Sequence, residues 1–453
     1  MKKFVAFWVC MTCTLVVSDA MATNGYFAHG YGTKNKGMSG AGVALPQDTI
    51  AAATNPAGMV HLGERLDAGL AIFSPRRDYE SSASQANGTG GAFTLGPDDI
   101  QSDRNYFPVP HVGYNYPLDS QSSLGITLYA NGGMNTVWNE GSSTFDPDGS
   151  GPNPTETFPG TYGGGVSGVD LAQLFLALTY SRKINEQLSY GISPVLAVQA
   201  FRIKGLSSFA PYTEDFVRSD GEVPPNDLTD NGRDFSFGYG ARVGMLWSPT
   251  SYLSVGAAYQ SRIFMTEFDD YDNLLAEEGD FDIPPSMTIG FALKRTSGLT
   301  FVFDFQKIWY FKVDSVANPI ANIFDCPTAG GTDPESCLGG SNGAGFGWED
   351  MEVYRFGVQC PIAPDLELRA GASFAEHPID RSEVLFNILA PAVVENHYTL
   401  GLTKKLSGDR EVNIAVMYSP RERQEGPNPF DPTQTIEIEI YQFDLEISFS
   451  KRF

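Results

Sequence analysis

Side chains that perform acid–base or metal chemistry are sparse in this sequence. No two histidines have the i, i+4 spacing of a metal-binding helix, and none lies in a nucleophile motif. The sequence therefore predicts a protein that is not an enzyme and needs no metal or other cofactor. The five histidines are His29, His61, His111, His377 and His397.

Residues 163–168, GGGVSG, formally match the glycine pattern of dinucleotide-binding proteins. That pattern binds phosphate when a strand precedes it and a helix follows it. Neither element is expected here, so we interpret this segment as a loop.

The first residues are typical of an export signal. Lys2 and Lys3 precede an apolar stretch over 4–17, which is too short to span a bilayer, and Ala20-Met21-Ala22 forms a small-residue cleavage site. A membrane anchor is the alternative. We predict a signal peptide over residues 1–22 and an oxidising compartment for the remainder.

Two cysteines fit that compartment. Cys326 and Cys337 flank a segment rich in Pro, Gly and Asp, and we expect them to form a disulfide. Closing such a loop restricts the unfolded chain by roughly 3 kcal/mol. Cys360 shares its parity with apolar neighbours and is predicted to lie on an apolar face.

Net charge and hydropathy indicate which class of protein this is. The formal net charge is −24, so the chain lacks the basic surface of a nucleic-acid-binding protein. After the apolar N-terminal stretch, no apolar run is long enough for a transmembrane helix. The 48 glycines and 12% aromatic residues, with a slightly negative mean hydropathy, are typical of a β-barrel with one wet and one apolar face.

Strict alternation marks the strands. In 441–449 the odd positions are Tyr, Phe, Leu, Ile and Phe, and the even positions are polar. The closing Phe453 follows the same parity. Upstream of Ile440/Tyr441 the apolar residues change parity, which predicts that lipid contact ends there, with a bulge or a rise of the strand above the membrane. Because charges on a lipid-facing wall are costly, we expect these charges to point into the lumen: Arg242, Arg262, Arg355, Glu367 and Arg369.

Connection lengths alternate between short and long. Short turns are expected at 117–120, 184–187, 248–251, 295–298, 362–365 and 406–409. Long polar connections are expected at 80–107, 133–168, 205–233, 267–283, 313–349, 376–392 and 420–434. This alternation predicts an antiparallel transmembrane β-barrel of about 14 strands over residues 65–453. Several soluble domains are the alternative.

Residues 23–64 are rich in Gly and Ala and do not alternate. Since they precede the first strand, they must lie inside the barrel as a plug or below it as an extension. Small residues allow close packing against a wall, as a plug requires, and the residues alone leave both placements open.

The sequence resembles the FadL-type outer-membrane transporters of long-chain fatty acids and other hydrophobic compounds. The resemblance covers the whole chain after residue 22, with Asn55-Pro56-Ala57 near the end of the segment 23–64 as its most specific motif. It implies a monomeric barrel in the bacterial outer membrane, plugged by residues 23–64 and in contact with outer-membrane lipid and with a hydrophobic small-molecule ligand. It also implies a lateral exit at a kink in the third strand, where Gly132 and Gly133 can supply the bend.

Long-chain fatty acids are the first predicted ligand, and aromatic or alkane hydrocarbons are the alternative. A surface adhesin is a further alternative of a different class. Plug aromatics and nearby cations are candidates for the ligand path, and the cations could bind a carboxylate. They are Tyr26, Phe27, Tyr31, Lys34, Lys36, Arg242 and Arg262.

Overall fold

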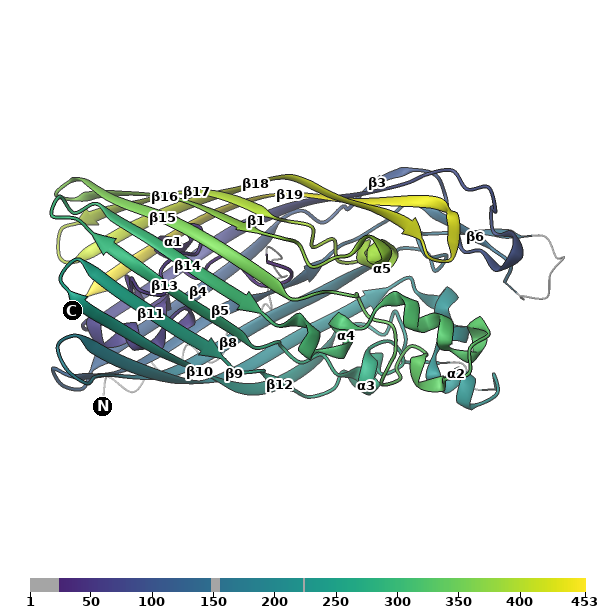
Figure 1. The fold of residues 1–453 in the computed structure, drawn as a ribbon, viewed down its shortest axis with the longest axis horizontal. Helices are drawn as coiled ribbons and strands as arrows, with labels where there is room; N and C mark the ends of the chain where they lie inside the picture. Colours follow the sequence, from purple (N-terminus) through teal and green to yellow (C-terminus); the bar gives the residue numbers. More distant parts are fainter. Residues whose placement is uncertain (1–23, 148–154, 223–224) are drawn as a thin grey trace, which may run out of the picture.

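Fourteen long strands pair in chain order and close into an antiparallel barrel in this computed structural model (Figure 1). The structure describes residues 24–147, 155–222 and 225–453, so the predicted signal peptide over 1–22 lies outside it. The predicted fold class is confirmed. The barrel strands are β1 (Arg65–Ser81), β4 (Phe107–Pro117), β5 (Ser122–Asn135), β8 (Gly168–Lys183), β9 (Leu188–Lys204), β10 (Asp234–Thr250), β11 (Leu253–Gln260), β13 (Ser286–Lys294), β14 (Thr300–Ile308), β15 (Met351–Ala363), β16 (Leu366–Ala375), β17 (Asn396–Leu406), β18 (Arg410–Asn428) and β19 (Asp431–Arg452).

Shorter elements decorate this barrel. Two short strands, β3 (Asp99–Gln101) and β12 (Phe264–Met265), pair with β1 and β10 at the rim. A separate small sheet contains β2 (Thr94–Leu95), β6 (Ser142–Phe145) and β7 (Glu156–Pro159). Among the described residues, no helix is both long and apolar enough to cross a membrane. The helices of the long connections are η4 (Thr89–Gly91), η5 (Ser207–Tyr212), α2 (Glu214–Arg218), η6 (Asp269–Tyr271), α3 (Ala276–Gly279), η7 (Tyr310–Lys312), α4 (Asp314–Ala317), η8 (Ile320–Asp325), η9 (Pro327–Ala329), η10 (Pro334–Ser336), η11 (Arg381–Glu383) and α5 (Val384–Asn387).

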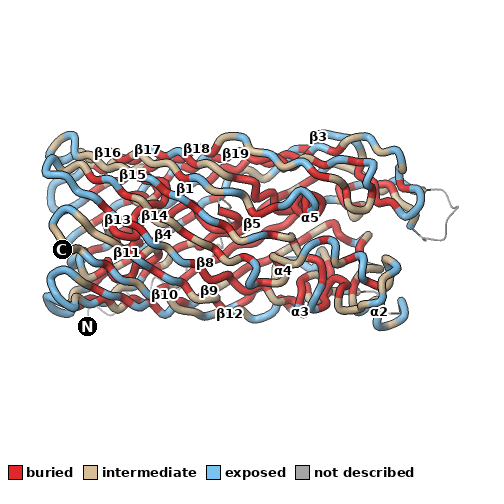
Figure 2. The backbone as a smooth tube through the Cα atoms, in the orientation of Figure 1, coloured by how far each residue is buried: buried red, intermediate tan, exposed pale blue. Residues whose placement is uncertain are grey.

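Buried and exposed residues alternate along much of the wall, as Figure 2 shows for the strands that face the viewer. In β19, Phe443, Leu445 and Ile447 are about half exposed on the outer face, whereas Asp444 and Glu446 are buried inside. The expectation that strand charges point inward holds for Arg242, Arg355, Glu367 and Arg369, which share the lumenal parity of their strands. An outer face this apolar is stable when lipid covers it.

The short turns occur where the sequence predicts them, at the end of the barrel where the C-terminus lies (Figure 1). Six of the seven predicted long connections also occur. The seventh, at 420–434, is wrong: β18 and β19 continue as a ribbon to a tight hairpin, with Asn428 paired to Asp431. The polar residues that suggested a loop are strand residues, since Arg423 forms ion pairs with Glu437 and Glu439 across the ribbon.

The irregularity predicted at Ile440/Tyr441 falls on the neighbouring strand. The pairing of β18 with β19 shifts between Ser419 and Glu422, opposite Tyr441. Along β19 the even-numbered residues face the inside throughout, and Ile436, Ile438 and Ile440 are buried there beneath the outside loops. The odd-numbered residues face outward, and from Glu439 toward the loops they are charged or polar instead of apolar. The apolar outer band of this strand thus ends at Tyr441.

Residues 24–64, called the hatch below, pack against the inside of the barrel. They contain α1 (Thr33–Lys36), η2 (Thr49–Ala53) and η3 (Pro56–His61), which contact strands on opposite sides of the lumen. Most of the hatch residues are buried, and β1 begins directly after them at Arg65.

Glycines in the wall make room for the hatch. A side chain at Gly256 would overlap the backbone of Val43, and one at Gly371 would overlap the backbone of Met38. Backbone cannot move aside as a flexible side chain can, so these glycines set how closely the hatch fits. Further wall glycines in contact with the hatch are Gly113, Gly125, Gly132, Gly191, Gly244, Gly357 and Gly401.

We expect Gly256→Val to loosen the hatch and to raise the ion conductance of the protein in planar bilayers several-fold, because the added side chain displaces the backbone at Val43. Ala257→Val, which adds similar volume on the exposed outer face of the same strand, is the matched control and should conduct like the parent. An unchanged conductance in a folded Gly256→Val barrel would show that the hatch fit does not depend on this contact.

Candidate functional site

The barrel wall is incomplete between β4 and β5. Their pairing stops at His111↔Tyr129, although β4 continues along β1 to Phe107 and β5 continues along β8 to Asn135. The β5–β8 register shifts between Ala130 and Gly132 at the same height. Residues 107–110 and 130–135 therefore face each other without a strand ladder.

Two prolines in β4 prevent that ladder from forming. Pro108 and Pro110 have no N–H, so their pairing with Ile72 and Leu70 of β1 cannot use one. Their nitrogen positions therefore face β5, where a donor would be needed. Proline is confined to strand edges for this reason, and the Pro-x-Pro spacing was a sequence signal for the break.

The first described residues of the hatch cover the break from inside. Phe27 forms an isolated bridge with Gly132, and the Gly133 N–H donates to the Tyr26 carbonyl at 2.8 Å. Residues 24–28 thus pair with the part of β5 that β4 leaves unpaired. This pairing requires glycine at position 132, because any side chain there would overlap the Tyr26 carbonyl.

Aromatic rings connect this covered break to the outside loops. Tyr26 lies 5.5 Å from Phe27 and 6.0 Å from Phe281 between ring centroids, and Phe281 lies 6.2 Å from Phe201 near the top of β9. Trp348 also contacts Tyr26, at 5.8 Å. Tyr26 and Phe27, two predicted path residues, therefore lie at the inner end of a continuous aromatic contact chain.

An apolar pocket lies at the outer end of that chain. Five connections or strand ends close around it, and among the described lining residues Ser315 supplies the single hydroxyl. Its space, ≈ 40 Å³ accessible to the centre of a water molecule, is far below the usual size of a ligand pocket, so the loops must part for a ligand to enter. The sequence did not predict this pocket. Its lining is Phe201, Ile203, Leu206, Phe209, Leu274, Leu275, Ser315, Leu338, Ala344, Gly345, Phe346, Phe386 and Leu389.

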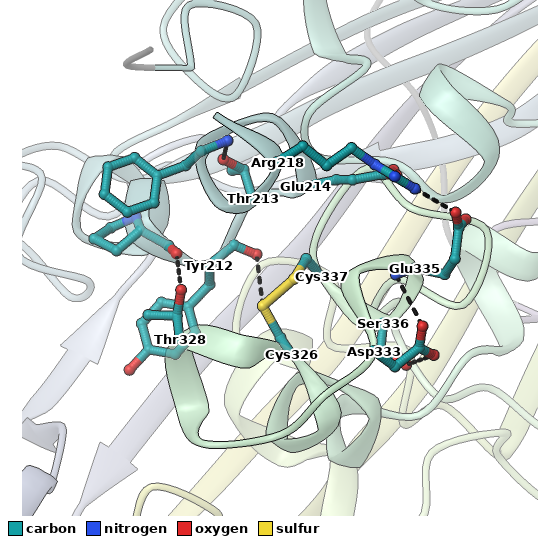
Figure 3. The surroundings of a disulfide bond; sticks show 12 residues. Tyr212, Thr213, Glu214, Arg218, Cys326, Thr328, Asp333, Glu335, Ser336 and Cys337 are labelled. Atoms are coloured by element: carbon teal, nitrogen blue, oxygen red, sulfur yellow. Dashed lines mark hydrogen bonds and ion pairs between the residues drawn. A yellow bond between two sulfur atoms is a disulfide. The ribbon is translucent and has the colours of Figure 1, made fainter. Parts of the chain in front are cut away.

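The predicted disulfide braces one side of this pocket. Cys326 and Cys337 form a disulfide (Figure 3). Leu338, the next residue, lines the pocket and forms an isolated bridge with Thr213. The Thr328 hydroxyl donates to the Pro211 carbonyl on the neighbouring connection. The disulfide therefore closes a loop within one outside connection, and the contacts of that loop with Pro211 and Thr213 join it to the neighbouring connection at the pocket.

The Asn55-Pro56-Ala57 motif anchors the hatch. The Asn55 side-chain amide donates to the carbonyls of Val43, at 2.8 Å, and Met245, at 2.9 Å, and its oxygen accepts from the Ala57 N–H. Gly244 leaves the space that Asn55 fills. The motif thus binds the hatch to itself and to β10, a structural role without a direct part in the aromatic chain.

The two predicted hatch lysines are held by barrel carboxylates. Lys34 Nζ lies 2.6 Å from Glu411, and Lys36 Nζ lies 2.9 Å from Asp444 and 2.8 Å from Glu446. All five groups are buried. Breaking one partner of a buried pair costs about 3–5 kcal/mol, so these lysines fix α1 against β18 and β19.

The two predicted arginines occupy different places. Arg242 is buried beside the hatch, where its guanidinium group donates a hydrogen bond to the side-chain oxygen of Gln260. Its carbon Cζ lies 6.0 Å from the ring centroid of Tyr31. Arg262 lies beyond the end of β11, in an outside connection, so the expectation that it projects from a strand into the lumen is wrong. There it pairs with Asp280 and Asp282. Burial and the neighbouring Asp282 raise the pKa of Asp280 to about 7.

The sequence matches a known protein family over nearly its whole length. The model of the family "Outer membrane protein transport protein (OMPP1/FadL/TodX)" matches residues 14–428. The chain belongs to this family. It is accordingly an outer-membrane β-barrel of a family that transports hydrophobic compounds, and the predicted resemblance and location are confirmed. No protein of curated function matches the sequence.

Solved structures of this family share the fold. The toluene transporter TodX of Pseudomonas putida is 16% identical, over 95% of this chain and 100% of that one, with a TM-score of 0.64. The toluene transporter TbuX of Ralstonia pickettii is 14% identical, over 94% and 99%, with a TM-score of 0.59. A FadL homologue of Pseudomonas aeruginosa is 16% identical, over 95% and 100%, with a TM-score of 0.62.

Removing the disulfide should weaken the pocket without unfolding the barrel. In the double variant Cys326→Ser/Cys337→Ser the loop between the two positions is no longer closed, so it has more conformational entropy to lose when a ligand binds. We therefore expect the apolar fluorophore N-phenyl-1-naphthylamine to bind about three- to tenfold more weakly. Fluorescence titration of the purified protein measures this, with Cys360→Ser as the control. Equal affinity in all three proteins would exclude a role for the bond in the pocket.

Proposed function

We propose that this protein carries uncharged hydrophobic small molecules passively across the outer membrane. A ligand enters the apolar loop pocket, moves along the aromatic chain to residues 24–28, and leaves sideways through the β4–β5 break once these residues move. The observation that carries the proposal is the continuous line of ring contacts from Phe201 in the pocket to Phe27 at the break.

The energetics suit such a path. Each methylene removed from water contributes about 0.8 kcal/mol, so a dry pocket concentrates a ligand that an aqueous pore would not retain. The hatch blocks an aqueous pore through the barrel. A lateral exit delivers the ligand to the apolar layer of the membrane without passage through the polar layer outside it.

An uncharged ligand fits the charges in the structure. Three of the four cations that could bind a carboxylate are already paired with carboxylates: Lys34, Lys36 and Arg262. The pocket itself is lined by apolar side chains apart from Ser315. The similar barrels TodX and TbuX are toluene transporters, which supports aromatic hydrocarbons as the substrate class.

Long-chain fatty acids remain the second candidate because of one observation. Arg242 and Arg355 line a small cavity between hatch and wall together with one carboxylate, Asp304. Asp304 already accepts the N–H groups of Gly42 and Val43. A fatty acid carboxylate could bind the two guanidinium groups if the hatch moved.

Uptake assays separate the two substrates. Cells that lack their own transporters and express this protein should take up labelled toluene several-fold faster than empty-vector cells, and Arg242→Gln should leave that rate unchanged. Arg410→Gln, at the exposed start of β18, is the matched control. If oleate uptake also exceeds the vector and Arg242→Gln abolishes it, fatty acids are substrates. If neither compound exceeds the vector, the proposed function is wrong.

A further inference from the structure

Two arginines inside the barrel form their hydrogen bonds with neutral amides instead of carboxylates. Arg242 Nη2 donates to the side-chain oxygen of Gln260, and Arg355 Nη2 donates to that of Gln306 at 2.6 Å. Arg242 is 7% exposed and Arg355 is 5% exposed. With the residues that the structure describes, neither guanidinium group forms a further hydrogen bond or an ion pair. A buried charge without a counter-charge is unfavourable, so both groups need one.

Both guanidinium groups line one cavity between the hatch and the wall. Among the described residues of its lining, Asp304 supplies the single carboxylate. Its oxygen Oδ2 already accepts the N–H groups of Gly42, at 2.7 Å, and Val43, at 2.9 Å. Two positive side chains and one negative side chain therefore leave one excess positive charge at this cavity.

His29 adds a further donor to the cavity lining. It is fully buried, and neither of its ring nitrogens has a hydrogen-bond partner in the described part of the chain. A neutral imidazole carries one N–H that can donate. The Nε atoms of Arg242 and Arg355 are likewise buried without a partner there. Three side chains around one small space thus have N–H groups that no described protein atom accepts.

The size of the cavity limits what can bind to these donors. Its space, ≈ 20 Å³ accessible to the centre of a water molecule, holds one particle of about that size. A phosphate is too large for it while the hatch is in place. A water molecule fits but leaves the positive charge unbalanced, whereas a single-atom anion matches both the volume and the charge. We propose that a halide ion, naturally chloride, binds between Arg242, Arg355 and His29.

The halide joins the hatch to two strands of the wall. His29 belongs to the hatch, Arg242 to β10 and Arg355 to β15. Because the ion pairs of Lys34 and Lys36 hold the hatch as well, loss of the halide lowers the thermal stability without releasing the hatch. The halide also occupies the guanidinium groups that a ligand carboxylate would need. The proposal does not depend on which ligand the barrel transports.

Bromide locates the site directly, because it replaces chloride and gives an anomalous X-ray signal. Crystals of the protein grown in sodium bromide should show an anomalous peak within hydrogen-bond distance of both guanidinium groups. Arg355→Gln removes the excess charge and should abolish this peak, and Arg242→Gln serves instead if that variant does not fold, as judged by heat-dependent gel migration. Arg410→Gln, at the exposed start of β18, is the matched control and should keep the peak.

Thermal unfolding tests the same site in solution. Exchanging sodium gluconate for sodium chloride at equal ionic strength should raise the Tm of the parent by about 2–4 °C, since an ion that binds the folded barrel stabilises it. This difference should vanish in Arg355→Gln and persist in Arg410→Gln. Bromide peaks elsewhere but none at the cavity, a cavity peak that persists in Arg355→Gln, or an equal chloride effect in that variant would each overturn the proposal.

Discussion

The missing ladder between β4 and β5 is the constraint on which the rest of the structure depends. A strand edge in a membrane wall leaves backbone groups without partners, which is costly in lipid. Pro108 and Pro110 remove the donors on one side, and residues 24–28 bond to the bend at Gly132 on the other. The ladder can therefore be missing from the wall because residues 24–28 of the same chain supply the partner that β4 does not.

The remainder of the hatch keeps that partner in place. Lys34 and Lys36 fix α1 to one side of the barrel, and Asn55 fixes η3 to the other. Wall glycines let the hatch backbone lie directly against the strands. Residues 24–28 lie outside these anchors and are held by backbone hydrogen bonds with Asn131 and Gly133, by the Tyr310 hydroxyl and by ring contacts. In the proposed function it is this segment that moves, while the rest of the hatch stays in place.

Local patterns predicted the wall but not the contacts across it. Period-two alternation is a property of neighbouring residues, so the parity of β19 and the inward direction of Arg242 could be derived from sequence. The hairpin at Asn428 and Asp431 was missed because charged strand residues above the membrane resemble a loop. Ion pairs such as Lys34–Glu411 and the loop pocket join distant segments, and no local spacing encodes them.

The central claim is that residues 24–28 must leave the break before a ligand can pass, and a photochemical cross-link tests it most directly. A photoreactive benzoyl-phenylalanine replaces Phe27, and toluene uptake is measured before and after illumination, with the same analogue at Leu62 as control. Uptake should fall in proportion to the fraction of protein cross-linked between position 27 and β5, and the Leu62 control should be unaffected by light. Uptake at the dark rate by fully cross-linked protein would contradict the account.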